Sequence, residues 1–80
     1  MRSHKMTSLG IAVRKQRKSL HLTQEQLGAF AGCGALFIHE LEQGKATVRL
    51  NKLIDVLKVL GLQLTLEPGK SGFKTKEIDP

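Results

Sequence analysis

Hydrophobic residues recur at helical spacing through the first 60 positions of the chain and then alternate with polar ones. Positions three and four apart share one face of a helix, so each such block predicts an amphipathic helix. The predicted helices cover residues 8–20, 24–31, 35–43 and 50–60. The alternating run LQLTL at 62–66 has the period of a β-strand. The pattern predicts an all-α bundle followed by one short strand.

Turn and capping residues set the predicted helix ends. Thr23 precedes the second helix and Gln26 follows three positions later, which is a capping box. Gly32 stands just after that helix, where a left-handed conformation is easiest for glycine. Ser8 is the predicted cap of the first helix and Thr47 that of the fourth.

The second and third predicted helices, joined at Gly32, have the spacing of a helix-turn-helix unit. Leu27, Ala31, Ile38 and Leu41 fall where such a unit needs its core contacts. A helix-turn-helix unit sets its second helix into the major groove of DNA.

The patterns of the fourth helix and of the strand indicate that the chain pairs with a second copy of itself. The apolar stripe of residues 50–60, which we expect to face the domain, consists of Leu50, Leu53, Ile54, Leu57 and Leu60. Val56 and Val59 widen this stripe, which suggests one surface for the domain and another for a partner. A lone strand is unstable, and we expect no mate for 62–66 within the chain, so the expected mate is the same strand of another subunit. The predicted dimer contacts are Val56, Val59, Leu62, Leu64 and Leu66.

The formal net charge of +6 and a sequence pI near 9.9 favour a polyanionic partner. Residues 1–22 contain six cationic side chains and no acid, whereas 23–44 contain three acids and no Lys or Arg. Positive charge returns over 45–61. Cations that flank a reading unit fit phosphate contacts on both sides of it.

Several classes of site are not predicted. A single Cys excludes an internal disulfide, and His21 and His39 lack neighbours at ligand spacing, so we expect no metal and no cofactor. Glu40 and Glu42 point to different sides of a helix, and no nucleophile with a base is visible, so we expect no enzyme. The chain has neither a secretory signal nor an apolar run of about 20 residues, which predicts a cytoplasmic protein with no membrane partner.

Residues 9–68 closely resemble the Cro/C1-type (XRE) helix-turn-helix family, and within it the HipB-type antitoxins. The resemblance rests on the TQ opening at Thr23, the I-x-x-L-E-x-G-K run from Ile38 to Lys45 and the strand after the last helix. It implies a lambda-repressor-like bundle whose C-terminal β-strand pairs across a homodimer. It also implies a palindromic operator in double-stranded DNA and a HipA-like Ser/Thr kinase toxin as partner.

The resemblance also assigns roles to residues. It implies contacts from the start of the second helix and the loop after the third to the DNA backbone, through Gln24, Lys45, Thr47 and Arg49. Arg14 on the first helix is a further backbone candidate because of its charge. The resemblance places base reading around Ala35, Leu36 and Glu40. His39 is a further candidate base reader, because helical spacing puts it on the same exposed face of the third helix. The resemblance also implies a structural ion pair between Arg17 and Glu42.

The predicted organisation is an N-terminal arm at 1–7, a DNA-binding and dimerisation domain at 8–67 and a flexible tail at 68–80. The expected function is repression of the chain's own operon as the antitoxin of a type II toxin–antitoxin pair. The residues leave two alternatives open: an orphan XRE-type regulator, or a toxin-binding interaction module with weak DNA binding. Ala35 and Leu36 keep the second alternative open, because apolar side chains reach thymine methyls but cannot make bidentate bonds to bases.

Overall fold

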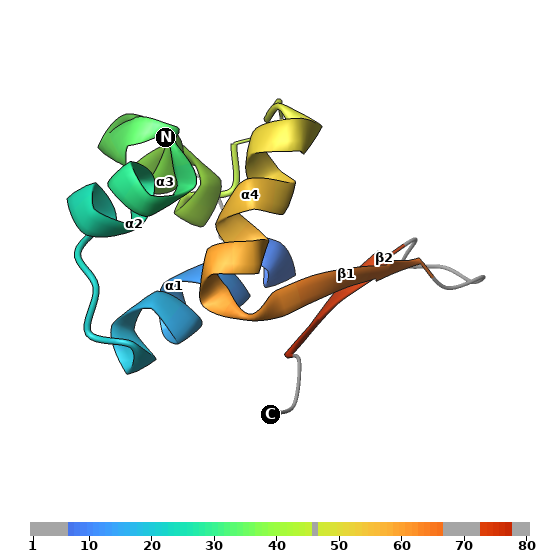
Figure 1. Ribbon diagram of the computed structural model, residues 1–80. Helices are drawn as coiled ribbons and strands as arrows, with labels where there is room; N and C mark the ends of the chain where they lie inside the picture. The colour runs from blue at the N-terminus through green and yellow to red at the C-terminus, as the bar shows by residue number, and fades with distance from the viewer. Residues whose placement is uncertain (1–6, 46, 67–72, 78–80) are drawn as a thin grey trace, which may run out of the picture.

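The computed structural model describes residues 7–45, 47–66 and 73–77. Four helices precede a two-stranded antiparallel hairpin (Figure 1). The elements are α1 (Ser8–Ser19), α2 (Gln24–Ala31), α3 (Gly34–Glu42), α4 (Leu50–Leu60), β1 (Leu62–Leu66) and β2 (Phe73–Glu77). The four predicted helices and the predicted strand are therefore present, within one residue at each end.

Local capping rules explain two of the helix starts. Thr23 accepts from the backbone N–H of Gln26 at 3.0 Å, and the Gln26 side chain accepts from Thr23 N at 2.9 Å, which completes the capping box. Thr7, rather than the expected Ser8, caps α1 by accepting from Gly10 N at 2.9 Å. Thr47 does not cap α4, because Arg49 occupies the N-cap position.

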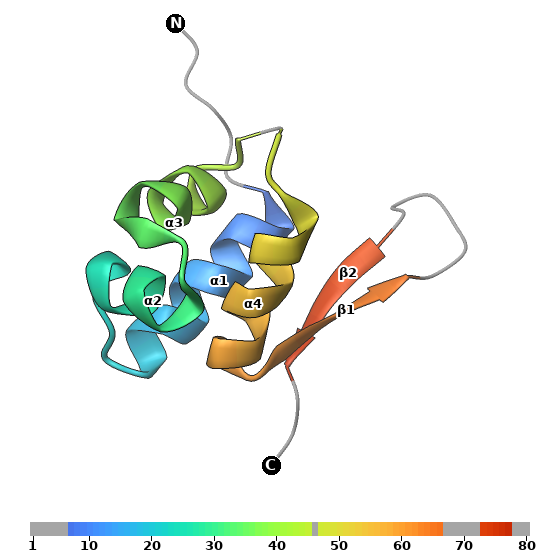
Figure 2. The same ribbon diagram turned by 45° about the horizontal axis from the view of Figure 1, so that its top comes forward.

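The core lies where the helices converge. It is built from aliphatic side chains of all four helices and β1: Val13, Leu27, Ala31, Ile38, Leu41, Leu53, Val56, Leu57, Leu60 and Leu62. α2 packs on α3 and α4, and α1 packs on the same two helices from the other side. Figure 2 shows α1 behind α3 and α4, so the helix-turn-helix rests on two supporting helices.

The close contact between α2 and α3 depends on Gly28. A Cβ at this position would lie 2.5 Å from the carbonyl oxygen of Gly34 and 2.9 Å from the nitrogen of Ala35, both backbone atoms. The turn between them uses Gly32 at φ +73°, the left-handed region that glycine adopts without strain. The two glycines therefore set how tightly α3 lies against α2.

The hairpin corrects one sequence-based expectation. β1 pairs with β2 of the same chain, in a register that runs from Leu62 opposite Glu77 to Leu66 opposite Phe73. The expectation that no internal segment could pair with 62–66 was wrong. The segment FKTKE reads as polar, but backbone bonds hold a strand and edge strands commonly carry lysine. The rest of the predicted tail and residues 1–6 of the predicted arm lie outside the described residues.

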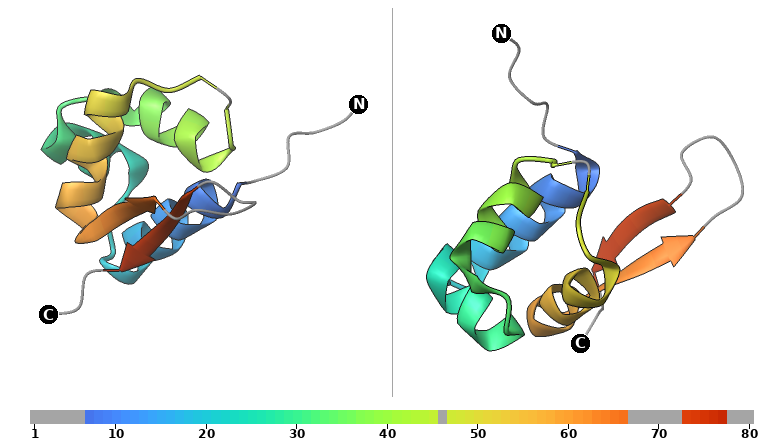
Figure 3. Two further views of the ribbon diagram at one scale, coloured as in Figure 1. Left: turned by 90° about the vertical axis from the view of Figure 1, so that its right-hand side faces the viewer. Right: turned by 90° about the horizontal axis from the view of Figure 1, so that it is seen from above.

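The buried face of α4 also differs from the prediction. Val56 is 0% exposed and packs inside its own domain, whereas Leu50 is 62% and Ile54 40% exposed. The core takes positions i, i+3, i+4 and i+7 from Leu53, so the apolar stripe is rotated relative to the predicted one. Figure 3 shows the hairpin leaving the end of α4, away from α2 and α3.

Candidate nucleic-acid interface

The solvent face of α3 carries the four predicted base readers. Leu36 is 69% exposed, His39 is exposed, and Ala35 and Glu40 are half-buried. The opposite face, with Ile38 and Leu41, is buried against the core. The structure therefore presents these four side chains on one surface of a helix whose opposite face is buried in the core.

That surface has a limited capacity to read bases. Leu36 and Ala35 can contact thymine methyls, and a Glu40 carboxylate can accept from cytosine N4. Lys45 lies 3.2 Å from Glu40 in an ion pair that is open to solvent. Such a surface pair is worth only about 0–1 kcal/mol, so a base or a phosphate can displace either partner at little cost.

A buried carboxylate organises the start of α2. Glu42 is 1% exposed and accepts from Arg17 Nε at 2.6 Å and from Arg17 Nη2 at 3.0 Å. Arg17 Nη1 also donates to the carbonyl of Leu22 at 2.9 Å. The implied ion pair is thus present in the structure, and it joins α1, the α1–α2 loop and the end of α3.

Gln24 belongs to the same network. Its Nε2 donates to Glu42 Oε1 at 3.2 Å, and the residue is half-buried at the first position of α2. A contact to phosphate therefore uses the second amide hydrogen of Gln24 or the open backbone N–H groups of the helix end. The sequence did not indicate this bond, because Gln24 and Glu42 are 18 positions apart.

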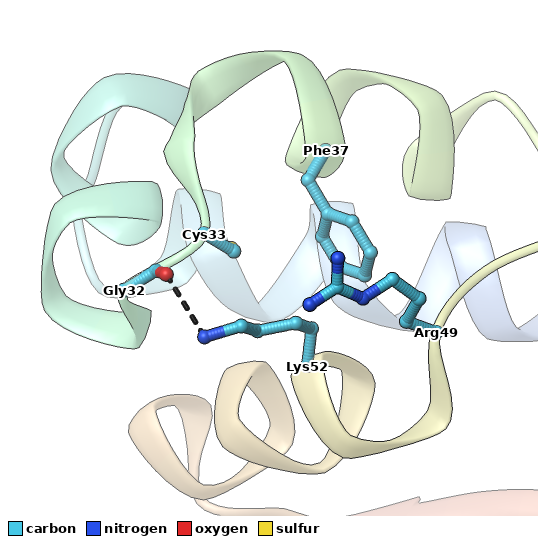
Figure 4. Close-up of a pocket in the computed structure, with 5 residues that line it drawn as sticks. All are labelled: Gly32, Cys33, Phe37, Arg49 and Lys52. Carbon is cyan, nitrogen blue, oxygen red and sulfur yellow. Dashed lines mark hydrogen bonds between the residues drawn. The ribbon is translucent and has the colours of Figure 1, made fainter.

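The remaining backbone candidates are exposed but dispersed. Thr47 and Arg49 follow α3 and precede α4, whereas Arg14 lies on α1. Arg49 lines a pocket with Phe37 and other residues at the junction of α3 and α4 (Figure 4). Sequence reasoning assigned no contact to Lys52, yet its Nζ donates to the carbonyl of Gly32 at 3.1 Å and so ties α4 to the turn.

The predicted dimer residues need correction at two positions. Val56 and Leu62 are buried in their own domain, so they have no surface to offer a second copy. Val59 and Leu64 are half-buried, and the side chain of Leu66 is outside the described part. The exposed apolar side chains of α4 are instead Leu50 and Ile54, which belong to the stripe that was predicted to face the domain.

The thiol of Cys33 is half-buried where α3 begins. Burial raises the pKa of this thiol, and the nearby ammonium of Lys52 partly offsets that effect. Among the described residues, no group of three His, Cys, Asp or Glu could hold a metal ion. Within the same ranges, no helix is long and apolar enough to cross a membrane.

Comparison with known proteins agrees with this geometry. The family model described as "Helix-turn-helix domain" matches residues 8–68. The uncharacterized HTH-type transcriptional regulator y4mF of Sinorhizobium fredii (strain NBRC 101917 / NGR234) is 41% identical over 63 residues, which covers 78% of this chain and 83% of that protein. The family match over residues 8–68 spans all four helices and β1, so the chain belongs to the helix-turn-helix domain family.

Proposed function

We propose that this protein is a sequence-specific DNA-binding regulator that represses transcription. The arrangement around α3 carries the proposal: an exposed helix face is flanked by the open start of α2 and by the cations that follow α3. A duplex that accepts α3 in its major groove would bring its phosphates to Gln24 on one side and to Lys45, Thr47 and Arg49 on the other. The name of the y4mF relative, an HTH-type transcriptional regulator, supports a role in transcriptional regulation.

We further propose that the regulator acts as a homodimer on a palindromic operator. A strand has two hydrogen-bonding edges, so β1 can pair with β2 and still add the β1 of a second copy at its other edge. Leu50 and Ile54 on α4 add exposed apolar surface that a second copy could cover. Two copies would present two α3 helices to half-sites about one helical turn, or a multiple of it, apart.

The proposed biological role is that of an antitoxin for a HipA-like Ser/Thr kinase toxin. The TQ opening of α2 and the close of α3 support this role by their likeness to HipB-type antitoxins. Co-expression with a kinase encoded beside this gene, followed by co-purification, tests it. Failure of a neighbouring kinase to bind, or the absence of such a gene, would leave an orphan regulator.

One observation favours a second candidate, a protein-interaction module. Leu36 is 69% exposed at the centre of the surface assigned to DNA, and apolar surface of this kind also suits a protein partner. Replacement of Leu36 by Ala separates the candidates: it changes the ranking of DNA sequences if α3 reads bases, and weakens only the protein complex if it does not.

Gel retardation on the protein's own upstream DNA, over a range of salt concentrations, tests the regulator function. Lys45→Ala should weaken binding to every sequence and reduce the salt slope by about 0.9, the value for one phosphate contact. Glu40→Gln/Lys45→Ala controls for the carboxylate that the single variant exposes. Lys18→Ala controls for the loss of an exposed charge on α1. Equal, non-selective retardation of unrelated DNA by the wild type would refute sequence-specific regulation.

A further inference from the structure

A pocket lies between the turn after α2, the α3 helix and the first turn of α4. Its volume is about 280 Å³, and Gly32, Cys33, Phe37, Arg49 and Lys52 line it. Sites for drug-sized molecules usually measure about 300–1,000 Å³, so this pocket lies just below that range and has room for a small molecule. Figure 4 shows Lys52 reaching from α4 towards Gly32, and Arg49 lying beside the ring of Phe37.

The lining residues give the pocket a positive charge. Two of the five are cations and none is an acid. Lys52 donates one hydrogen to Gly32 O, which leaves two for another acceptor. The Arg49 guanidinium has neither an ion pair nor a hydrogen bond to any residue in the described ranges. Asp55, one turn farther along α4, acts on Cys33 electrostatically but does not line the pocket.

Two helices begin at this pocket. Cys33 is the N-cap of α3 and Arg49 the N-cap of α4, and neither helix receives a side-chain cap from the described part of the chain. Helix N-termini expose backbone N–H groups and carry partial positive charge. Cations in the first turn of α4 oppose its dipole, and an anion in the pocket would remove this repulsion.

We propose that this pocket binds a phosphate group through Arg49 and Lys52, with Phe37 available to contact an attached organic group. The phosphate belongs either to a small monoester or to the backbone of bound DNA. The second source rests on the proposed function, and the first does not. The open lining predicts a dissociation constant of roughly 1 mM for inorganic phosphate.

Titration of the ¹⁵N-labelled full chain with sodium phosphate, at constant ionic strength, tests the proposal. We expect saturable shifts of the amides of Gly32, Cys33 and Phe37. Arg49→Gln/Lys52→Gln should weaken binding at least tenfold. Lys58→Gln, which removes one positive charge at an exposed site on α4, should leave it unchanged. Circular dichroism of each variant verifies that it is folded.

Two results would overturn the site. Shifts that spread over the surface and rise without saturation mean an adventitious ion only. Equal affinity for phosphate in the wild type and the double variant would show that phosphate does not bind in this pocket.

A second titration, with the protein bound to its upstream duplex, distinguishes the two sources of phosphate. Loss of phosphate binding identifies a DNA phosphate as occupant, and retained binding identifies the monoester. A chain that binds phosphate but no duplex contradicts the proposed function alone.

Discussion

Replacement of Arg17 by Met tests the buried network that joins α1 to the end of α3. Arg17 makes two bonds to Glu42 and one to the carbonyl of Leu22, and the Glu42 carboxylate is almost inaccessible to water. Removal of the guanidinium leaves that charge buried with only the Gln24 amide beside it. Breaking a buried pair in this way costs about 3–5 kcal/mol.

This cost is large for a chain of this size. An 80-residue domain has an unfolding free energy of about 4–12 kcal/mol, so Arg17→Met should remove at least a quarter of it. With a urea m-value near 1 kcal/mol/M, the unfolding midpoint should fall by about 3 M or more. Circular dichroism at 222 nm, followed through a urea titration, measures this shift.

Matched variants separate charge burial from loss of volume. Lys18→Met removes an exposed charge from the same helix and should stay within about 0.5 kcal/mol of wild type. Arg17→Met/Glu42→Met removes both charges and should recover most of the loss, since an apolar pair can replace a buried ion pair. A loss below about 1 kcal/mol for Arg17→Met would refute the reasoning, because it means that water reaches the pair. So would a double variant whose loss equals the sum of the two single losses.

Three further predictions concern packing and the thiol. Gly28→Ala should lower the free energy of unfolding in urea by about 1–3 kcal/mol, because its Cβ would meet the backbone of α3. Ala29→Ser, at an exposed site of the same helix, should have little effect. An equal loss at both positions would contradict the close contact between α2 and α3. Ile38→Ala should cost about 2–5 kcal/mol and Leu36→Ala less than about 0.5 kcal/mol, and thermal melts that reverse this order would place the wrong face of α3 in the core. Since the pKa of Cys33 is raised, its thiolate fraction at pH 8 is low. Ellman's reagent should therefore react more slowly with Cys33 in the folded protein than with the same cysteine in an unfolded peptide of the same sequence. The reaction rate of the folded protein should still increase above pH 9. A rate equal to that of the peptide would contradict this prediction.

Local sequence patterns were sufficient to predict the helix ends that depend only on neighbouring residues. The start of α2 follows from Thr23 and Gln26, which bond to each other within one turn. Its end follows from Gly32, whose conformation needs no distant contact. Hydrophobic spacing likewise located α4, because helical periodicity is a property of the segment itself.

Only part of the candidate site could be predicted from the sequence. The exposed residues of α3 were indicated by the resemblance to a known family together with helical spacing, but the bonds that fix their surroundings join residues far apart in the chain. Gln24 bonds to Glu42, and Lys52 bonds to Gly32. Neither bond has a local signal, because each depends on how α2, α3 and α4 pack.

Amino-acid order alone established four helices, one strand and a basic chain built around a helix-turn-helix unit. Packing in three dimensions determined the rest. It selected Val56 rather than Ile54 for the core, and it gave β1 a mate in Phe73–Glu77 despite the lysines of that segment. The reason is physical: periodicity and capping act over a few residues, whereas burial and strand pairing depend on the partner that the whole chain brings into contact.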